Sequence, residues 1–275
     1  MFDSAPRARK RFGQHFLCDR DVIEFIIAQF DPRDPAPVIE IGPGRGALTA
    51  PLLARLDSLT VIELDRDLVD LLRERFRDTA LRIISADALK YDFRLPASGS
   101  RLRLVGNLPY NISTPLLFHL LAQMECVASM LFMLQHEVVE RMCAAPGEAA
   151  YGRLSVMLQS CCLAEQLMVI GPESFNPPPK VKSAIVRLTP DPSLRERLLD
   201  TSRFEQIVRL AFSKRRKTLR NALRELDIPS LFEESGINPE LRAECLSVAD
   251  YISLANVYSN SVLNTKSVDK IVNRK

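Results

Sequence analysis

Short apolar runs alternate with amphipathic stretches through the first 135 residues of this 275-residue chain. In the stretch Leu68–Phe76 the apolar residues Leu68, Leu71, Leu72 and Phe76 recur at helical spacing, whereas the apolar runs have the length of buried strands. Such alternation predicts repeated βα units around a parallel sheet. The strands expected in this part are Val38–Ile41, Leu59–Leu64, Leu81–Ser85, Leu102–Gly106 and Ser129–Leu134.

Later residues extend this pattern and then change it. We expect helices at Pro115–Leu121, Glu137–Ala144 and Leu154–Ala164, and a closing pair of strands at Gln166–Ile170 and Ala184–Leu188. The prediction for residues 1–190 is therefore an α/β domain, doubly wound around a mostly parallel seven-stranded sheet. Beyond Pro190 and Pro192 only helical periodicities remain, which predicts a small all-helical domain over residues 191–258. Residues 259–275 are polar and weakly periodic, so we expect a loose tail.

Several classes of protein are disfavoured by the composition. The six cysteines form no C-x-x-C pair and no disulfide framework, which favours reduced thiols. The longest apolar stretch, Val127–Leu134, is too short to span a bilayer, and residues 1–16 lack the apolar core of a secretory signal. We expect a soluble cytoplasmic protein with no membrane partner, and a monomer because no exposed apolar heptad is evident.

Positive charge is concentrated in two segments. Residues 1–16 have a net charge of +3 and residues 176–224 a net charge of +9, which leaves the rest at −9 because the chain totals +3. Basic blocks on an otherwise acidic chain indicate a polyanionic partner. A solvated basic helix face is the alternative for either segment alone.

A glycine-rich turn, Glu40-Ile41-Gly42-Pro43-Gly44-Arg45-Gly46, directly follows the first predicted strand of the sheet. Glycines permit a tight turn and close approach of the backbone to a ligand, and the helix that follows offers N–H groups to an anion. The turn also matches a dinucleotide fingerprint, and a tight turn without any ligand is a further alternative. Glu40 and Pro43 favour a nucleoside without a pyrophosphate.

Polar side chains follow the next three strands at regular intervals. Glu63, Asp87 and Asn107 each end a predicted strand. Glu63 comes 23 positions after Glu40, Asp87 comes 24 after Glu63, and Asn107 comes 20 after Asp87. The carboxyl ends of parallel strands line one crevice, so these side chains should converge there. Glu63 could accept from both hydroxyls of a ribose, and Asp87 from an amino group on a purine edge. The crevice suits an adenosine-bearing, positively charged cofactor, although any one carboxylate could simply cap a helix.

The segment Asn107-Leu108-Pro109-Tyr110 is the most specific signal. The exocyclic amine of a base is a poor nucleophile because its lone pair is delocalised into the ring. Two acceptors, the Asn107 amide oxygen and the Leu108 carbonyl held by the restriction that Pro109 imposes, would favour a pyramidal nitrogen with its lone pair available. Tyr110 could stack on the base. A simple strand-end turn is the alternative.

With these motifs the chain resembles the bacterial KsgA/RsmA family, S-adenosylmethionine-dependent dimethyltransferases of two adjacent adenosines near the 3′ end of small-subunit ribosomal RNA. The resemblance covers the chain to about residue 258. The matching segments are Lys10–Leu17, the glycine turn, Val61–Asp65, Ala86–Ala88, Val105–Pro115, Phe132–Met142, Tyr151–Gln159, Phe175–Ser183 and Arg215–Leu223.

The resemblance implies a Rossmann-like class I methyltransferase fold and the roles of particular residues. It implies that S-adenosylmethionine is bound by His15, Leu17, Gly42, Glu63, Asp87 and Asn107. Position 15 is often asparagine in relatives. A main-chain contact from His15 would survive this difference, whereas a side-chain contact would be changed by it. The reaction centre would comprise Asn107, Leu108, Pro109 and Tyr110, with Phe175 as a second wall of the base pocket opposite Tyr110.

Basic residues outside the crevice are candidates for RNA contacts. The run from Lys214 to Arg220 is expected to open a helix with a basic ridge that would bind backbone phosphates without reading sequence. The candidates are Lys10, Arg11, Lys180, Lys182, Lys214, Arg215, Arg216, Lys217 and Arg220. We expect no metal, because His119 and His136 have no second ligand at helical spacing.

Two other functions stay open at this point. One is a methyltransferase of large-subunit RNA that confers macrolide resistance, which shares the architecture and a similar N-x-P-Y motif. Leu108, residues 137–142 and residues 151–155 look more like the small-subunit enzymes. The other is a non-catalytic role as an assembly checkpoint on immature small subunits.

Overall fold

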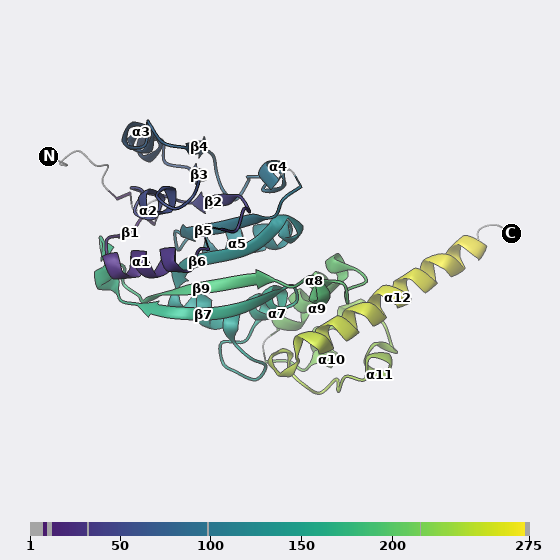
Figure 1. Cartoon of the computed structure of the whole chain (residues 1–275). Coiled ribbons are helices and arrows are strands. Elements are labelled where there is room, and N and C mark those ends of the chain that lie inside the picture. The colour runs from purple at the N-terminus through teal and green to yellow at the C-terminus, as the bar shows by residue number, and fades with distance from the viewer. Residues whose placement is uncertain (1–7, 10–12, 32, 98, 215, 273–275) are drawn as a thin grey trace. The chain divides into compact units, whose positions relative to one another are not determined.

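The computed structural model describes residues 8–9, 13–31, 33–97, 99–214 and 216–272 (Figure 1). The chain divides into two compact units: residues up to 139 together with 164–190, and residues 140–163 together with those from 191 onward. The domain boundary predicted at residue 190 places residues 140–163 in the sheet domain. In the structure these residues are part of the second, helical unit.

The first unit is built on the seven-stranded sheet that the sequence predicts. Its strands lie in the order β4-β3-β2-β5-β6-β9-β7. The first five strands in this order run parallel to one another, and β9 is antiparallel to β6. Their bounds are β2 Val38–Ile41, β3 Leu59–Glu63, β4 Leu81–Ser85, β5 Leu102–Asn107, β6 Val127–Gln135, β7 Cys162–Ile170 and β9 Ser183–Pro190. The strand order reverses between β2 and β5, which is where ligands bind in doubly wound sheets.

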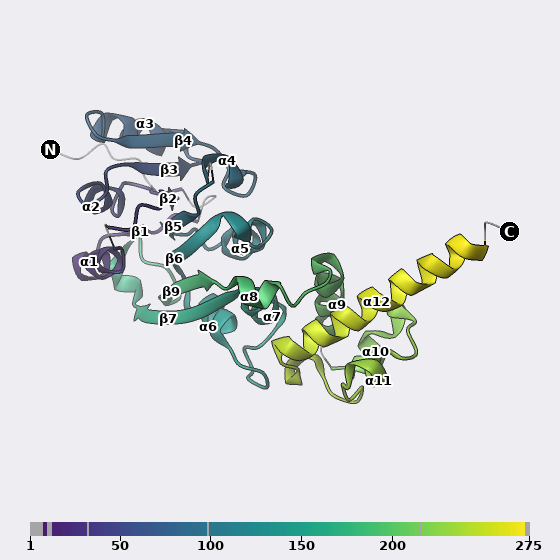
Figure 2. The ribbon, with the colours of Figure 1, turned by 45° about the vertical axis from the view of Figure 1, so that its right-hand side comes forward.

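Helices cover both faces of this sheet. In Figures 1 and 2, α1 (Arg20–Ala28) and α2 (Thr49–Leu53) lie on one face, while α4 (Arg94–Ala97) and α5 (Ser113–Leu121) lie on the other. A hydrophobic core lies on the face covered by α1 and α2. In it, residues of α1, α2 and α3 (Arg66–Arg75) pack against strand residues such as Val61 and Val105. A two-stranded pair of β1 (Phe16–Leu17) and β8 (Phe175–Asn176) brings the N-terminal segment beside residues far along the chain. Short 3-10 turns, η2 (Met124–Cys126) and η3 (Pro172–Ser174), precede β6 and β8.

The second unit is helical. It contains the second half of α6 (His136–Cys143) together with α7 (Arg153–Gln159), α8 (Pro192–Arg195), α9 (Thr201–Ser213), α10 (Leu219–Ala222), η4 (Arg224–Leu226), α11 (Leu231–Ser235), η5 (Ala243–Cys245) and α12 (Val248–Val272). Phe204 and Tyr251 are fully buried between α9 and α12. The Tyr251 hydroxyl donates to the Ala243 carbonyl at 2.8 Å, so its one polar atom is paired inside the core.

Two local predictions were wrong. The helix expected over Leu154–Ala164 ends at Gln159, because Cys162 begins β7 and pairs with β9 instead. The loose tail expected over residues 259–275 is helical to Val272 as part of α12. Ser259 is buried, and its hydroxyl donates to the Ala255 carbonyl at 2.8 Å. A serine hydroxyl that bonds to the carbonyl four residues earlier can be buried in a helix without an unpaired polar atom. The polar sequence pattern does not reveal this bond.

One buried guanidinium holds the connection between α1 and β2. Arg103 in β5 is 4% exposed, and its side chain donates to the carbonyls of Asp31, Asp34 and Ala36 at 2.8, 3.0 and 3.3 Å. The same group lies 5.4 Å from the centre of the Phe30 ring. A buried charge paired so fully is costly to disturb.

Arg103→Met is therefore expected to lower the free energy of unfolding by about 3 kcal/mol, because the carbonyls lose their donor while the apolar stem is retained. Urea denaturation followed by circular dichroism measures the change. The exposed Arg101 in the same segment supplies the control, and Arg101→Met should cost less than about 0.5 kcal/mol. Equal losses in the two variants would contradict the role of Arg103.

Candidate active site

A cavity of about 430 Å³ opens at the carboxyl ends of β2, β3 and β5, where the strand order reverses. The N-terminal segment of residues 13–18 forms part of its wall. The structure brings most of the predicted site residues together in this lining: His15, Leu17, Gly42, Glu63, Asp87, Asn107, Leu108, Pro109 and Tyr110. They come from five separate parts of the chain and meet because parallel strands end at one edge of a sheet.

Glycine is required at two positions of the turn after β2. Gly42 and Gly44 have φ angles of +67° and +58°, which side chains rarely tolerate. A Cβ on Gly44 would also lie 3.1 Å from the Phe16 ring. The turn thus brings backbone N–H groups close to the cavity, and that of Gly44 donates to the Glu63 carboxylate at 3.3 Å.

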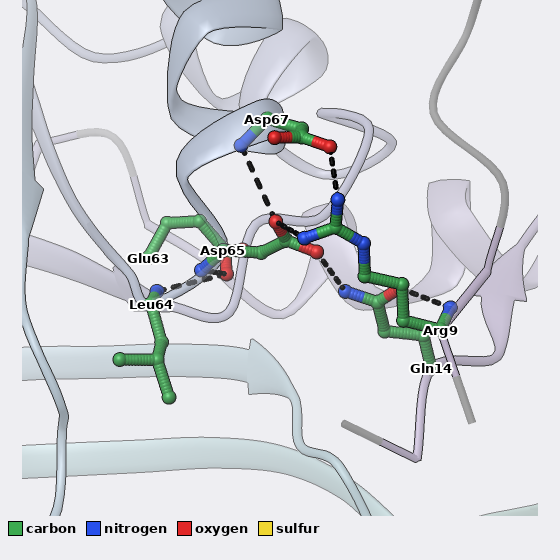
Figure 3. A network of polar contacts seen from close by, with 6 residues as sticks. All are labelled: Arg9, Gln14, Glu63, Leu64, Asp65 and Asp67. Carbon is green, nitrogen blue, oxygen red and sulfur yellow. Dashed lines mark hydrogen bonds and ion pairs between the residues drawn. The ribbon is translucent and has the colours of Figure 1, made fainter. Parts of the chain in front are cut away.

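The carboxylate of Glu63 is held by backbone donors. Its Oε1 accepts from the N–H groups of Leu64 and Asp65, each at 2.8 Å (Figure 3). Its Oε2 accepts from the N–H group of Gly44. Glu63 is 7% exposed, and this burial raises its pKa despite the three donors. A carboxylate has about four acceptor positions, so Oε2 retains capacity for a hydroxyl in the cavity.

Asp87 lies at the end of β4 with one oxygen used locally. Its Oδ1 accepts from the Leu89 N–H at 3.0 Å, and Oδ2 has no partner among the residues that the structure describes. Leu64, which lines the same cavity as the two acids, is 51% exposed although it follows a buried strand. Two carboxylates and an apolar side chain at a strand edge can together bind a ribose and a purine.

The amide of Asn107 has a defined orientation. Its Nδ2 donates to the main-chain carbonyl of His15 at 2.9 Å. A carbonyl oxygen can only accept, so the amide nitrogen must face His15 and Oδ1 must point away from it. The carbonyl of Leu108, the next residue in the cavity lining, has no partner within the described part of the chain, so it is available as a second acceptor.

Tyr110 completes this end of the cavity. Its hydroxyl and the Ser183 hydroxyl lie 2.6 Å apart, and partial burial raises the pKa of Tyr110. The His15 ring stacks on the Tyr110 ring with centroids 5.5 Å apart, and His15 Nδ1 lies 2.8 Å from the Pro177 carbonyl. An oriented amide, an open carbonyl and an aromatic ring are the groups that can bind and activate the amine of an unpaired base.

Comparison with known proteins identifies the family of this chain. Residues 5–260 match the model of the family described as ribosomal RNA adenine dimethylase. The chain belongs to this dimethylase family. A relative from Xanthomonas campestris, named ribosomal RNA small subunit methyltransferase A, is 53% identical over 92% of this chain and 97% of its own. Xanthomonas oryzae has a relative of the same name, identity and coverage.

Solved structures confirm the class I methyltransferase fold of this chain. A dimethyladenosine transferase from Plasmodium falciparum is 26% identical, with a TM-score of 0.78 over 90% of this chain and 98% of its own. The 23S ribosomal RNA methyltransferase ErmE is 24% identical, with a TM-score of 0.66 over 88% of this chain and 98% of its own. The likeness to ErmE concerns the fold alone.

Phe175 does not reach the cavity. It is 3% exposed and packs in the hydrophobic core, so it presents no ring face opposite Tyr110. The cause is the register of β8, in which Phe175 pairs with Leu17 and Asn176 with Phe16. Neighbouring residues of a strand point to opposite sides, and it is Asn176 that lines the cavity.

The basic candidates are exposed but not arranged as predicted. Lys180 and Lys182 are exposed near β9, and Lys214, Arg216, Lys217 and Arg220 are exposed in the helical unit. The basic run does not open a helix: α9 ends at Ser213 and α10 begins at Leu219, because Thr218 is extended and pairs with Arg242. Lys214 and Arg220 form ion pairs with Glu225 and Glu240. Lys10, Arg11 and Arg215 lie outside the described residues.

Two further expectations concern membranes and metals. Within the described residues, no helix has the length and apolar character needed to cross a membrane. The same residues contain no group of three or more His, Cys, Asp or Glu side chains that could hold a metal ion.

Sequence reasoning missed several lining residues, among them Gln14, Leu64 and Asn111. Leu64 could have been predicted, because an apolar residue between two acids at the end of a strand is a candidate for contact with a ligand rather than with the core. Gln14 and Asn111 lie within two segments that resemble the family, Lys10–Leu17 and Val105–Pro115, but no pattern singled them out, because their positions depend on contacts with distant segments.

Glu40 is a buried acid at the end of β2. It accepts a hydrogen bond from the Thr49 hydroxyl at 2.6 Å, and burial, opposed by that bond and assisted by the nearby Glu63, raises the pKa of Glu40 to about 8. At pH values between the ordinary pKa of glutamate and about 8, Glu40 is protonated in the folded protein but ionised in the unfolded chain. The free energy of unfolding should therefore fall as pH rises from about 4.5 to about 8.

Glu40→Gln removes this titration, so the variant should gain stability over the parent by up to about 3 kcal/mol at pH 7, with little gain at pH 4.5. Urea unfolding of the cofactor-free protein at pH 4.5, 6, 7 and 8 measures the difference. Stability curves that stay parallel across this range would contradict the raised pKa.

Proposed function

We propose that this chain transfers methyl groups from S-adenosylmethionine to N6 of two adjacent adenosines in the 3′-terminal hairpin of small-subunit (16S) ribosomal RNA. The product would be N6,N6-dimethyladenosine, made in the cytoplasm during small-subunit biogenesis. The observation that carries the proposal is the oriented Asn107 amide, whose Oδ1 points away from His15, in a cavity that Leu108 and two acids also line. The 53% identical relatives named for the small subunit favour this substrate over large-subunit RNA.

The cavity fits an adenosine-bearing cofactor. Glu63 would hold the ribose hydroxyls through Oε2, Asp87 would accept the adenine amine through Oδ2, and the exposed Leu64 would cover the purine face. When bound, S-adenosylmethionine supplies a methyl group on positively charged sulfur. The negative charge of Glu63 and Asp87 suits a cation, and the glycine turn allows close approach of the backbone.

The residues at the other end of the cavity would prepare the adenine amine. Asn107 Oδ1 and the Leu108 carbonyl each accept one N–H, which keeps the nitrogen pyramidal and its lone pair aimed at the methyl carbon. A nitrogen–carbon bond forms as the sulfur–carbon bond breaks, and the nitrogen, now cationic, then loses its proton to solvent. Tyr110, anchored through Ser183, would stack on the base. Positioning and electrostatics therefore provide the catalysis, without a general base.

Exposed lysines and arginines would bind the RNA backbone. The described candidates are Lys180, Lys182, Lys214, Arg216, Lys217 and Arg220; Lys10, Arg11 and Arg215 are proposed from the sequence alone. Replacing Lys182 and Lys217 together by glutamine should weaken small-subunit binding and lower the slope of log affinity against log salt by about one to two. Lys90→Gln, an exposed lysine near β4, serves as the control and should leave the slope unchanged.

The proposal is tested by transfer of labelled methyl from S-adenosylmethionine to purified unmethylated small subunits, with large subunits in parallel. Label on small subunits alone, recovered as N6,N6-dimethyladenosine, is the expected result. Label on large-subunit RNA would instead favour the resistance-enzyme alternative. Absence of label on both, with cofactor binding intact, would overturn the ribosomal assignment.

A further inference from the structure

We propose that Gln14 and Arg9 are positioning residues for the methyl transfer, acting through the main chain of His15 on the amide of Asn107. This inference rests on the proposed function. Neither side chain needs to touch the substrate: the two hold the N-terminal segment against α3, and that segment presents the carbonyl that orients the catalytic amide.

The two side chains converge on Asp65 (Figure 3). Arg9 Nη1 donates to Asp65 Oδ1 at 2.8 Å, Gln14 Nε2 donates to Asp65 Oδ2 at 3.1 Å, and Arg9 also bonds Asp67. The Arg9 N–H donates to Gln14 Oε1 at 2.8 Å, so the two anchors also fix each other. Asp65 is only 2% exposed, and a carboxylate so buried needs paired donors.

Asp65 connects this anchor to the ribose-binding carboxylate. Its N–H donates to Glu63 Oε1 at 2.8 Å, and its side chain caps α3 through the Asp67 N–H at 3.3 Å. The position of Asp65 is therefore set by the end of β3 and the start of α3. A segment bonded to Asp65 is thereby bonded to the rigid part of the site.

From Gln14 the chain passes directly into His15, whose carbonyl accepts from Asn107 Nδ2 at 2.9 Å. On the other side of His15, β1 pairs with β8, so His15 lies between two anchors. The end of an amide side chain has two orientations of similar intrinsic energy, and a neighbouring carbonyl selects one of them. If Gln14 releases Asp65, the His15 carbonyl is no longer fixed, and the preference that keeps Oδ1 toward the target amine is weakened.

The test compares Gln14→Ala and Arg9→Ala with a matched control, Arg73→Ala. Arg73 also pairs with an aspartate of α3, Asp70, at 3.2 Å, but this pair is exposed and unconnected to the cavity. Methyl transfer is measured at saturating cofactor and subunits, and cofactor affinity is measured separately by calorimetry with S-adenosylhomocysteine. The Asn107 side-chain amide is followed by nitrogen-15 NMR in the cofactor-free protein, with Asn107→Asp identifying its signals.

In Gln14→Ala we expect kcat to fall about tenfold or more, a loss of cofactor affinity below about fivefold, and faster hydrogen exchange of the Asn107 amide. Arg9→Ala should lower kcat about two- to fivefold, and high salt should reduce the difference from wild type because the Arg9 pair is partly exposed. Arg73→Ala should change none of these quantities.

Wild-type kcat with unchanged Asn107 exchange in Gln14→Ala would overturn the inference. A fall in cofactor affinity equal to the fall in kcat, with unchanged Asn107 exchange, would also overturn it, since it would make Gln14 a cofactor contact. Failure of the proposed function looks different: the wild type would then label no small subunits, while the exchange of Asn107 would still respond to Gln14→Ala.

Discussion

Asn107→Ala is expected to lower kcat by about a hundred- to a thousandfold with folding intact. Groups aimed at charge that develops in a transition state have effects of this size when removed. Here the developing charge is positive, on the adenine nitrogen, and Oδ1 is held toward the cavity because Nδ2 is bonded to the His15 carbonyl. Single-turnover transfer of labelled methyl to small subunits measures the step.

A second variant separates the acceptor from its orientation. Asn107→Asp retains an oxygen acceptor, but its carboxylate cannot donate to the His15 carbonyl and would face it with like partial charge. We expect Asn107→Asp to lose nearly as much activity as Asn107→Ala, while thermal unfolding shows that both variants fold. If Asn107→Ala retained more than a tenth of wild-type activity, the proposed role of the Asn107 amide as an oriented acceptor would be ruled out.

Glu63→Ala is expected to weaken cofactor binding by at least about a hundredfold, because two ribose hydroxyls would lose a charged acceptor. The variant also leaves the N–H groups of Leu64 and Asp65 without their acceptor, so its folding is checked by circular dichroism. Calorimetry with S-adenosylhomocysteine gives the affinity. Glu74→Ala, an exposed acid on α3, is the control and should bind as the wild type does.

The affinity at Glu63 should also depend on pH. Burial raises the pKa of Glu63, so its charged form is lost at a higher pH than for an ordinary glutamate. Cofactor affinity should therefore decline as pH falls through the mildly acidic range, starting earlier than an exposed carboxylate would predict. Affinity that stays constant between pH 7 and pH 5 would contradict a role for the ionised Glu63.

Much of the site was predictable from sequence because it depends on a simple geometric rule. Glu63 and Asn107 each end a strand, and Asp87 lies two residues beyond the end of another. Parallel strands in a doubly wound sheet end at one edge, so the convergence of these side chains needs no knowledge of packing. The sheet itself followed from the alternation of apolar runs and helical stretches, since burial on both faces imposes that pattern.

Only the tertiary structure decided which way certain side chains point. Phe175 is buried and Asn176 faces the cavity because β8 pairs in one register with β1, and a shift of one residue would reverse them. Cys162–Ala164 form a strand because β9 supplies a hydrogen-bonding partner. The contact of Gln14 with Asp65 joins residues 51 positions apart. Local patterns encode local structure and burial, whereas the partners of a two-residue strand or a single polar side chain are set by segments that folding brings together.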